Sequence, residues 1–409
     1  MGKTLEHRGP NDSGQYISEH AAFAHTRLAV IDLAGGIQPM KRNKNGYEYA
    51  IVYNGELYNT EDIRKDLLGK GYEFQTTSDT EVLLTAYIEY GTKCPEYLNG
   101  IFSFAIWDSF HRQCFLCRDR FGVKPLFYSI TDQTVVFGSE IKALFEYPSI
   151  EPEINQYGLC ELFGLGPARS PGCGVYKGVN EVMPGFAAII DYSGMRLFPY
   201  WSLTARKHRD NYEQTVEKTR ELLLDSIKRQ LVSDVPICTL LSGGLDSSVV
   251  SAVAAKVLKE EGRQLDTYSF DYNENTKYFK ASSFQPAQDR PFVDIMVDTT
   301  GSNHTYLECD SNSLYETLYD AVLAKDFVKT MQKAKDTIGF IKNLPCYIFQ
   351  GRLKRSIRYV YQESVLMKSL EAIHGSLMKR HIIRIHFHGL KILTIEKVYC
   401  LPTFAECFQ

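Results

Sequence analysis

One segment of the chain joins an apolar strand, a loop of serine and glycine, and a helix of small residues in direct succession. We predict a buried strand at ICTLL (237–241), a loop at SGGLDSS (242–248) and a helix directly after it. A further strand is expected at LDTYSFDY (265–272). Because strand, helix and strand follow one another within one short unit, the two strands are expected to run parallel. Residues 212–325 should therefore form a doubly wound α/β domain.

The loop between this strand and this helix has the composition of an anion-binding site. Gly243 and Gly244 leave their backbone amides unobstructed, and the following helix adds partial positive charge at its N-terminus. Asp246 suits a magnesium ion that accompanies phosphates. Hydroxyl donors are available from Ser242, Ser247 and Ser248. Because the lysine of a GxxxxGK[ST] loop is absent, the pattern indicates a grip on pyrophosphate; the structural alternative is a glycine-rich turn with a helix cap.

The first 200 residues have a different pattern, which is typical of antiparallel β structure. Short aromatic or β-branched segments alternate with Gly, Asn and Asp turns, at residues 49–58, 102–108, 113–119 and 134–140. Two helices are expected among these strands. This combination predicts an α+β layered domain over residues 1–200, followed by a polar connector at 201–211.

The three helices with the clearest signals have recognisable starts, ends or apolar faces. The first begins near Thr60, and its apolar side is formed by Ile63, Leu67 and Leu68. The second opens with the capping box pattern of Ser78 and Glu81 and ends at Gly91. The third covers residues 212–232, with apolar residues at helical spacing: Val216, Leu223, Ile227 and Leu231.

Near residue 326 the charge balance of the chain reverses. Residues 326–409 contain 14 Lys and Arg against six Asp and Glu, whereas the whole chain has a net charge of −3. The apolar stretches of this tail show no consistent period, so we do not expect it to continue the same fold. Its basic segment 351–359 and its paired His386 and His388 are more typical of a solvated surface than of nucleic-acid or metal contact.

Composition argues against membrane proteins and zinc proteins. No run of 18 apolar residues suggests a membrane span, and the first residues lack the apolar core of a signal peptide, so we expect a soluble, cytoplasmic protein. Among the ten cysteines, Cys114 and Cys117 have CxxC spacing, but no second pair completes a zinc site. We interpret the cysteines as reduced packing residues. No nucleic-acid or membrane partner is expected.

The two halves of the chain resemble two domains of one known family. The segment SDVPICTLLSGGLDSSVVSA (233–252) resembles the pyrophosphate motif of N-type ATP pyrophosphatases, as placed in glutamine-hydrolysing asparagine synthetases. The first half resembles that family's N-terminal-nucleophile glutaminase domain, in the segments LEHRGPNDSGQY, HTRLAVIDLAGGIQPM, YNGELYN, TSDTEVLLTAY, LNGIFSFAIWD, RDRFGVKPLFY and FGSEIKALF. The resemblance implies an αββα sandwich over residues 1–200 and a partial α/β ATP pyrophosphatase domain over residues 212–325.

For the glutaminase domain the resemblance implies a role for each of nine residues. Asn54 and the backbone of Gly55 would form an oxyanion hole, in which two donors stabilise developing negative charge. Glu56 and Asp79 would hold the α-amino group of glutamine. The α-carboxylate would be held by Arg27, Leu28, Ala29, Val30 and Ile31, with the arginine as a fork. Taken singly, Asp79 is also a first-turn helix acid, and Arg27 could form a surface ion pair.

For the second domain the resemblance implies a site for ATP and Mg2+. Leu241, Ser269 and Tyr272 would flank the adenine and the ribose. The pyrophosphate would be held by Ser242, Gly243, Gly244, Leu245, Asp246, Ser247 and Ser248, with Asp246 as metal ligand. The implied reaction is attack of an aspartate carboxylate on ATP, followed by ammonia from glutamine, which yields asparagine, AMP and pyrophosphate. The partners would be the small molecules glutamine and aspartate, and the resemblance is compatible with a homodimer.

Two departures from the family pattern bear on activity. Family members carry a nucleophilic cysteine at the mature N-terminus, whereas this chain begins Met1-Gly2 and has its first cysteine at Cys94. We therefore expect that a strand bearing the cysteine belongs upstream of Leu5 and that glutamine hydrolysis is impaired without it. After residue 325 the family's GE-x-x-DE-x-F-GGY segment is not found, which suggests a shifted reading frame or an alternative exon.

Three functions remain open at this point. The leading one is glutamine-dependent asparagine synthesis by an ATP-dependent ligase, incomplete at both ends in this chain. The second is a relative that acts on another carboxylate, such as a β-lactam synthetase. The third is a non-catalytic protein that binds glutamine or a nucleotide. Binding of ATP with Mg2+, and its weakening by Asp246→Ala, would separate a surviving nucleotide site from a fragment without one.

Overall fold

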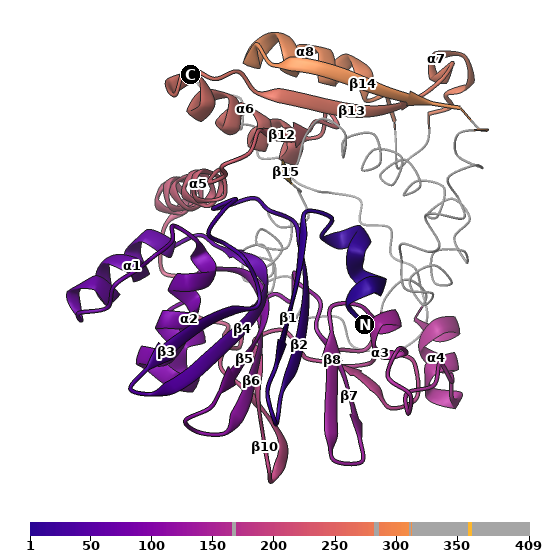
Figure 1. Ribbon diagram of the computed structural model, residues 1–409. Helices are drawn as coiled ribbons and strands as arrows, with labels where there is room; N and C mark the ends of the chain where they lie inside the picture. The colour runs from indigo at the N-terminus through magenta and orange to yellow at the C-terminus, as the bar shows by residue number, and fades with distance from the viewer. Residues whose placement is uncertain (166–168, 282–285, 311, 313–358, 362–409) are drawn as a thin grey trace. The chain divides into compact units, whose positions relative to one another are not determined.

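A six-stranded antiparallel sheet is the centre of the first half of the chain. The structure, a computed structural model, describes residues 1–165, 169–281, 286–310, 312 and 359–361. The sheet has the order β11 (Gly194–Pro199), β10 (Phe186–Asp191), β6 (Gln113–Arg118), β5 (Gly100–Asp108), β4 (Tyr47–Leu57) and β3 (Met40–Lys44) (Figure 1). The strands predicted at 49–58, 102–108 and 113–119 are thus confirmed as β4, β5 and β6.

Two smaller antiparallel sheets contribute to the same half. One is the hairpin of β1 (Asp12–Ile17) and β2 (Ala22–Arg27). The other has the order β8 (Thr134–Gly138), β7 (Phe127–Thr131) and β9 (Val179–Glu181). Side chains of both pack into one apolar cluster with residues of β4, β5 and β6; it includes Tyr16, Phe23, Ala50, Trp107, Leu116 and Tyr128. The small sheets therefore cover one face of the central sheet.

Helices cover the outer faces of these sheets. The first pair, α1 (Thr60–Gly69) and α2 (Asp79–Tyr90), packs on the central sheet in a cluster that includes Ile51, Leu67, Leu83 and Phe104. The second pair, α3 (Ile141–Leu144) and α4 (Gln156–Gly164), packs on the three-stranded sheet through Phe127, Leu144 and Leu162. Two 3-10 helices occupy Gly2–Arg8 and Gly91–Glu96. The layer order of helices, sheet, sheets and helices agrees with the expected α+β class.

The apolar face of α1 is narrower than the sequence predicted. Ile63 and Leu67 are buried, but Leu68 is 52% exposed. Since successive helical residues are rotated by about 100°, Leu68 lies on the side of α1 that turns away from the sheet. The prediction that all three leucine and isoleucine residues share the packed face is wrong at Leu68.

The capping box predicted at the start of α2 does not form. Ser78 caps the helix, and its Oγ accepts a hydrogen bond of 3.2 Å from the amide of Thr80. The Glu81 carboxylate instead accepts hydrogen bonds from the amides of Gln75 and Thr76 and forms an ion pair of 3.1 Å with Arg42. Because these partners satisfy the buried carboxylate, it does not reach back to the N-cap amide.

The second half contains a parallel sheet, as predicted. Its order is β14 (Asn303–Cys309), β13 (Asp266–Tyr272), β12 (Ile237–Leu240) and β15 (Tyr359–Tyr361), and every pairing is parallel. The helices are α5 (Tyr212–Arg229), α6 (Leu245–Glu260), α7 (Asn275–Tyr278) and α8 (Arg290–Thr300). Helix α5 packs on α6 through Ile227, Val250 and Val253, in agreement with the apolar spacing of residues 212–232.

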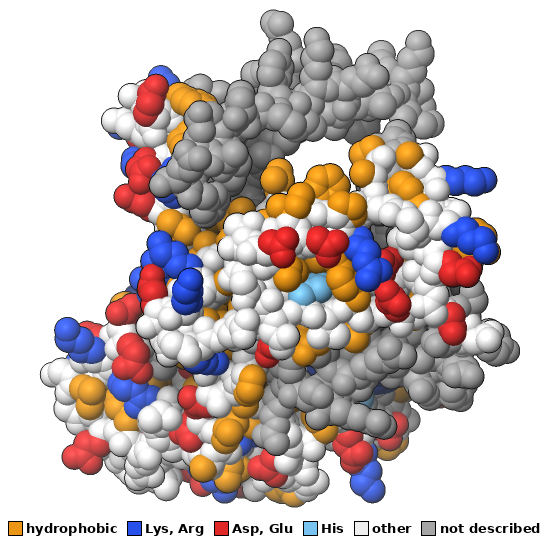
Figure 2. Space-filling view, turned by 90° about the horizontal axis from the view of Figure 1, so that it is seen from above, with side chains coloured by type: hydrophobic (Ala, Val, Ile, Leu, Met, Phe, Trp, Pro, Cys, Tyr) orange, Lys and Arg blue, Asp and Glu red, His pale blue; other side chains and the backbone are white. Residues whose placement is uncertain are grey.

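One short stretch of the basic tail joins this sheet. Strand β15 lies within residues 326–409, which the sequence analysis did not expect to continue the fold, yet it pairs with β12. The predictions for residues 351–358, His386 and His388 lie outside the described residues. On the face seen in Figure 2, acidic and basic side chains of the described residues are interspersed.

The cysteines of the described residues are all free thiols. Cys94, Cys114, Cys117, Cys238 and Cys309 are buried, which agrees with their interpretation as packing residues, whereas Cys160 is exposed and the interpretation is wrong there. Burial raises the pKa of Cys114 and of Cys238 to about 12, so both thiols stay protonated at neutral pH. In the part of the chain that the structure covers, no helix is long and apolar enough to cross a membrane.

Candidate functional site

One cavity has residues of both halves of the chain in its lining, and these include most of the residues predicted to bind glutamine. In the first half it is lined by β2, the loop after it, β4 and the start of α2. The predicted residues that line it are Arg27, Leu28, Val30, Ile31, Asn54, Gly55, Glu56 and Asp79. Ala29 is the exception: it is buried, its amide donates a hydrogen bond of 3.0 Å to Asn11 Oδ1, and it does not line the cavity.

Arg27 places a buried cation at one end of this cavity. Its guanidinium donates to the carbonyl oxygens of Leu33 at 2.9 Å and Asp32 at 2.6 Å, and more weakly to that of Ile31. Only 7% of the residue is exposed, and it forms no ion pair within the described residues. The alternative of a surface ion pair is therefore wrong for Arg27. A buried guanidinium oriented by carbonyl dipoles suits an incoming carboxylate.

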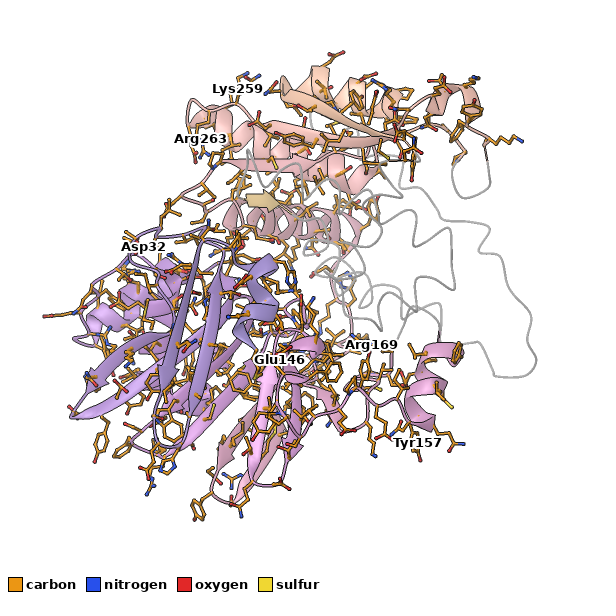
Figure 3. The ribbon with its side chains drawn as sticks, turned by 45° about the vertical axis from the view of Figure 1, so that its right-hand side comes forward. Asp32, Glu146, Tyr157, Arg169, Lys259 and Arg263 are labelled. Carbon is orange, nitrogen blue, oxygen red and sulfur yellow. The ribbon has the colours of Figure 1, made fainter. Side chains whose placement is uncertain are left out.

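The loop after β2 is held in shape by Asp32, a residue that sequence reasoning missed (Figure 3). Its backbone has a φ of 49°, and its carboxylate accepts hydrogen bonds from the amides of Gly35 at 2.6 Å and Thr77 at 2.8 Å. Desolvation alone would raise the pKa of Asp32, but these hydrogen bonds outweigh it and lower the pKa. A Cβ at Gly36 would lie 2.5 Å from Arg27 Nη2, so a larger residue there would require the guanidinium to move.

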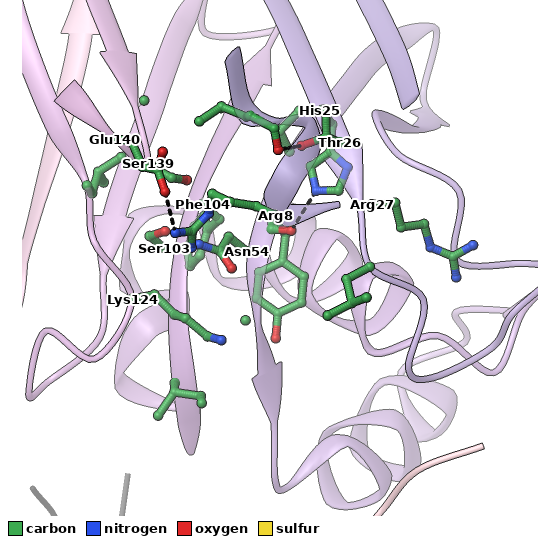
Figure 4. Close-up of a pocket in the computed structure, with 18 of the residues that line it drawn as sticks. Arg8, His25, Thr26, Arg27, Asn54, Ser103, Phe104, Lys124, Ser139 and Glu140 are labelled. Atoms are coloured by element: carbon green, nitrogen blue, oxygen red, sulfur yellow. Dashed lines mark hydrogen bonds and ion pairs between the residues drawn. The ribbon is translucent and has the colours of Figure 1, made fainter. Parts of the chain in front are cut away.

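Asn54 offers the cavity a hydrogen-bond donor that no described residue uses. It lies on β4 opposite Ser103 of β5, and its Nδ2 is buried without a partner. Figure 4 shows Asn54 among the residues that line the cavity. Next to it, a Cβ on Gly55 would lie 2.3 Å from the carbonyl oxygen of Ile101, so β4 and β5 approach each other too closely for any other residue. The Nδ2 of Asn54 is therefore a donor that remains available to a ligand oxygen.

Asp79 supplies a buried carboxylate at the start of α2. Its Oδ2 accepts hydrogen bonds from the Tyr53 hydroxyl at 3.0 Å and the Leu57 amide at 3.2 Å. Burial raises the pKa of Asp79 to about 6, although both hydrogen bonds act against this shift, and the negative charge of Glu56 adds to it. Asp79 is thus both the first residue of the helix and a group that can ionise near neutral pH.

Sequence reasoning missed a charged cluster on the far wall of the cavity. Glu140 is buried, and its carboxylate forms ion pairs of 2.9 Å with Arg8 and with Lys142. His7 Nε2 lies 3.1 Å from the same carboxylate, and Figure 4 shows Arg8 and Glu140 side by side. Burial favours a higher pKa for Glu140, but hydrogen bonds from His7 and Lys142 and the charge of Arg8 outweigh it and lower the pKa to about 2. Arg8 and Glu140 lie in two of the conspicuous segments, HRGP and GSEIKALF, which were the available signal.

A second set of predicted residues surrounds the turn from β12 to α6. Gly243 has a φ of 76°, and a Cβ there would lie 2.9 Å from the carbonyl oxygen of Asp289. Within the described residues, nothing accepts a hydrogen bond from the amides of Gly243 and Gly244. These amides and the N-terminus of α6 therefore keep donors that are free to bind an anion.

Ser247 has a different position from the one that the sequence predicted. Its side chain is buried; its Oγ lies 2.9 Å from Ser242 Oγ, accepts from the Ser242 amide and donates to the Gly244 carbonyl at 3.1 Å. The hydroxyl therefore braces the loop from inside and is not turned outward as a phosphate donor. The sequence could not distinguish the two orientations because both need a serine.

The carboxyl end of β13 adds further polar groups beside the loop. Ser269 donates through its Oγ to the Leu241 carbonyl, and both residues line the cavity together with Ser242, Gly244 and Tyr272. Asp271, which lies between the predicted residues Ser269 and Tyr272, accepts from the Asn275 side chain at 2.8 Å and from Arg290 at 3.2 Å. The carboxyl ends of parallel strands meet at one edge of the sheet, which explains why these groups converge.

The acidic residue of the loop fits the predicted role in binding Mg2+. Asp246 is exposed in the first turn of α6, beside the free amides of the cradle. A single carboxylate with phosphate oxygens and water is a usual ligand set for Mg2+. A cluster of three or more His, Cys, Asp or Glu that could hold a metal without phosphates does not occur in the described ranges.

Comparison with known proteins identifies both halves of the chain. Residues 1–201 match the profile of the glutamine amidotransferase domain, and residues 218–340 match that of asparagine synthase. The chain is 48% identical to asparagine synthetase [glutamine-hydrolyzing] 3 of Bacillus subtilis, over 80% of this chain and 53% of the relative. It is 34% identical to asparagine synthetase B of Escherichia coli, over 63% of this chain and 41% of that protein.

The matches also define the extent of the similarity. The chain spans about half the length of these curated relatives. Among solved structures, it is similar to the glutamine phosphoribosylpyrophosphate amidotransferase of B. subtilis, with 17% identity, 75% of this chain and 77% of that chain covered, and a TM-score of 0.37. A likeness at this level is too weak to support an argument.

Proposed function

Because the chain belongs to the family of the glutamine-hydrolysing asparagine synthetases, we propose that it binds glutamine in its first domain and ATP with Mg2+ at the SGGLDSS loop. The reaction served would be transfer of the glutamine amide nitrogen to aspartate. In this proposal the first domain is an N-terminal-nucleophile αββα sandwich, and the second is an ATP pyrophosphatase domain.

The unpartnered Nδ2 of Asn54 carries the glutamine half of the proposal. This donor shares one cavity with the buried cation of Arg27 and the buried carboxylate of Asp79. Glutamine has a complementary group for each: an amide oxygen for Asn54, an α-carboxylate for Arg27 and an α-ammonium for Asp79, with Glu56 nearby. Release of ammonia requires a nucleophile that adds to the amide carbon, and the residues named in this cavity do not include one. During such an addition the amide oxygen gains negative charge before the C–N bond breaks, and a fixed donor at that oxygen lowers the barrier.

The free amides of Gly243 and Gly244 carry the nucleotide half. They offer hydrogen bonds to phosphate oxygens, and Asp246 offers one ligand to an accompanying Mg2+. A grip on the β- and γ-phosphates leaves the α-phosphorus open to attack by a carboxylate oxygen. The bond from that phosphorus to the pyrophosphate then breaks, pyrophosphate leaves, and the acyl adenylate reacts with ammonia to release AMP and the new amide.

The nucleotide half is tested by isothermal titration of the full chain with ATP and Mg2+. We expect binding, and we expect Asp246→Ala to weaken it about tenfold, as for loss of one charged ligand. Asp298→Ala is the matched control, since it removes an exposed carboxylate from α8 outside the cradle. The proposal fails if the unaltered chain does not bind ATP with Mg2+, or if both variants bind it as tightly as the unaltered chain.

The glutamine half is tested by titration with L-glutamine. Arg27→Gln should abolish detectable binding because the α-carboxylate loses its cation. Arg64→Gln is the control: Arg64 also donates to carbonyl oxygens, those of Thr76 and Ser78, but it does not line the cavity. Equal affinities of both variants for L-glutamine would contradict the assignment of Arg27.

A further inference from the structure

The loop after β2 contacts a residue that lies 202 positions further along the chain. Asp234 Oδ2 accepts a hydrogen bond of 2.7 Å from the backbone amide of Asp32. In return, the Asp234 amide donates a hydrogen bond of 3.0 Å to the carbonyl oxygen of Val30. Two bonds in opposite directions define both the position and the orientation of Asp234 relative to residues 30–32.

Residues 30–36 are themselves closely linked to the glutamine cavity. The carbonyl oxygens of residues 31–33 orient the Arg27 guanidinium, and the Asp32 carboxylate binds the Thr77 amide next to the start of α2. A displacement of Asp32 would therefore move the cation and the edge of the Asp79 helix together.

On its other side, Asp234 is closely linked to the nucleotide loop. Ser233 Oγ bonds to both the amide and the carbonyl of Val235, at 3.1 Å and 2.9 Å, so the turn after Asp234 is tight. Three residues beyond Asp234 the chain enters β12, which is largely buried between β13 and β15 and leads directly to Ser242. A strand within a sheet transmits a displacement along its length with little bending.

We propose that Asp234 is a positioning residue that couples the two sites, so that binding of ATP with Mg2+ at the serine-glycine loop stabilises residues 30–36 around Arg27. The inference rests on the proposed function for the identity of the nucleotide. Asp234 itself is exposed, and an exposed polar contact contributes little to overall stability. Its contribution is therefore the fixed geometry between two loops, which is what a coupling element requires.

Hydrogen exchange measured by mass spectrometry on the full chain tests the coupling. In the unaltered chain, ATP with Mg2+ should slow exchange of the amides in residues 31–35. Asp234→Ala should speed exchange at the Asp32 amide about tenfold and remove the response to the nucleotide. Asp234→Asn retains an acceptor oxygen and should restore most of the protection and most of the response.

A matched control separates this contact from any other contact between the two halves. Asp62→Ala removes the carboxylate that pairs with Arg229 at 3.5 Å, a contact that involves neither residues 30–36 nor β12. It should leave protection of residues 31–35 and its response to ATP unchanged. Loss of the response in Asp62→Ala, or its persistence in Asp234→Ala, would overturn the assignment of Asp234.

The outcome also distinguishes the inference from the proposed function. If the unaltered chain binds ATP with Mg2+ by titration but residues 31–35 exchange as before, the coupling is wrong and the proposed function stands. If the unaltered chain does not bind ATP with Mg2+, the nucleotide half of the proposed function is wrong, and the coupling is overturned with it.

Discussion

The Tyr53 hydroxyl donates a hydrogen bond of 3.0 Å to Asp79 Oδ2 at the point where β4 faces the start of α2. Both residues are buried. Since burial disfavours the charged form of each, the pKa of Tyr53 is raised well above its usual value and that of Asp79 is raised to about 6. The carboxylate proposed to hold the ligand ammonium therefore changes charge within an accessible pH range.

The raised pKa of Asp79 predicts a particular dependence of stability on pH. Between pH 3.8 and about 6 the folded chain keeps a proton that the unfolded chain has released. The contribution of Asp79 to the free energy of unfolding must therefore fall as pH rises through this window, by about 3 kcal/mol in total. Urea denaturation of the unaltered chain and Asp79→Asn at several pH values should show this difference. If the free energies of unfolding of the unaltered chain and of Asp79→Asn differ by the same amount at pH 4 and at pH 7, the prediction is wrong.

Replacement of Asn54 should change stability little, because its Nδ2 has no partner to lose. We expect Asn54→Ala to alter the free energy of unfolding by less than about 1 kcal/mol. Gln38→Ala is the matched comparison, since this buried amide accepts from the Tyr53 amide at 2.7 Å and donates to Thr80 Oγ1. Gln38→Ala should lower the free energy of unfolding by about 2 kcal/mol or more, because the buried backbone amide of Tyr53 loses its acceptor. Equal costs in urea denaturation would mean that Asn54 is a structural residue.

Substitutions of Ser247 and Ser248, in the first turn of α6, should distinguish a residue that braces the loop from one that contacts phosphate. Ser247→Ala removes the acceptor of the Ser242 amide, so it should lower the free energy of unfolding by about 1 to 2 kcal/mol and weaken binding of ATP with Mg2+. The Ser248 side chain is half-buried and forms no hydrogen bond within the described residues. Ser248→Ala should weaken binding and leave stability unchanged. Urea denaturation and titration of both variants measure this, and a stable Ser247→Ala chain with full affinity would contradict the bracing role.

Gly55 should tolerate no side chain, because a Cβ there would clash with backbone atoms of β5 and with the Tyr53 ring. An alanine Cβ there would lie 2.3 Å from the Ile101 carbonyl oxygen and 2.8 Å from Phe102 Cα. Gly55→Ala should therefore destabilise the chain by about 3 kcal/mol or more. Gly69→Ala is the control, since a Cβ at this end of α1 meets nothing within 4 Å. Alanine there should raise the free energy of unfolding by about 0.5 to 1 kcal/mol. Similar unfolding midpoints for the two variants would show that β4 and β5 can separate locally.

Much of the fold could be predicted because it depends on local patterns. Alternation of aromatic and β-branched residues predicted β4, β5 and β6, and the strand, loop and helix around Gly243 predicted the parallel pair of β12 and β13. The spacing of Leu223 and Ile227 likewise predicted the packed face of α5. Each pattern is set by the geometry of a single element, so neighbouring residues are sufficient to recognise it.

Details of the site could not be predicted from the sequence, because they depend on residues that are distant along the chain. Whether Glu81 closes a capping box or binds Arg42 depends on a strand 39 residues away, and the inward turn of the Ser247 hydroxyl depends on how the loop folds over it. Asp32 lies in the segment HTRLAVIDLAGGIQPM and Asp271 lies in the strand end 269–272, but only their partners in space show that they shape the site.

The sequence by itself determined the two kinds of sheet, the glycine turn before α6 and the residue types that we propose for glutamine and ATP, since these follow from periodicity and from the chemistry of side chains at short spacing. Tertiary structure alone decided which of those groups are free to bind. Nδ2 of Asn54 and the amides of Gly243 and Gly244 keep unused donors, whereas the Ser247 hydroxyl does not. The physical reason is that satisfaction of a buried polar group depends on neighbours brought in from distant parts of the chain.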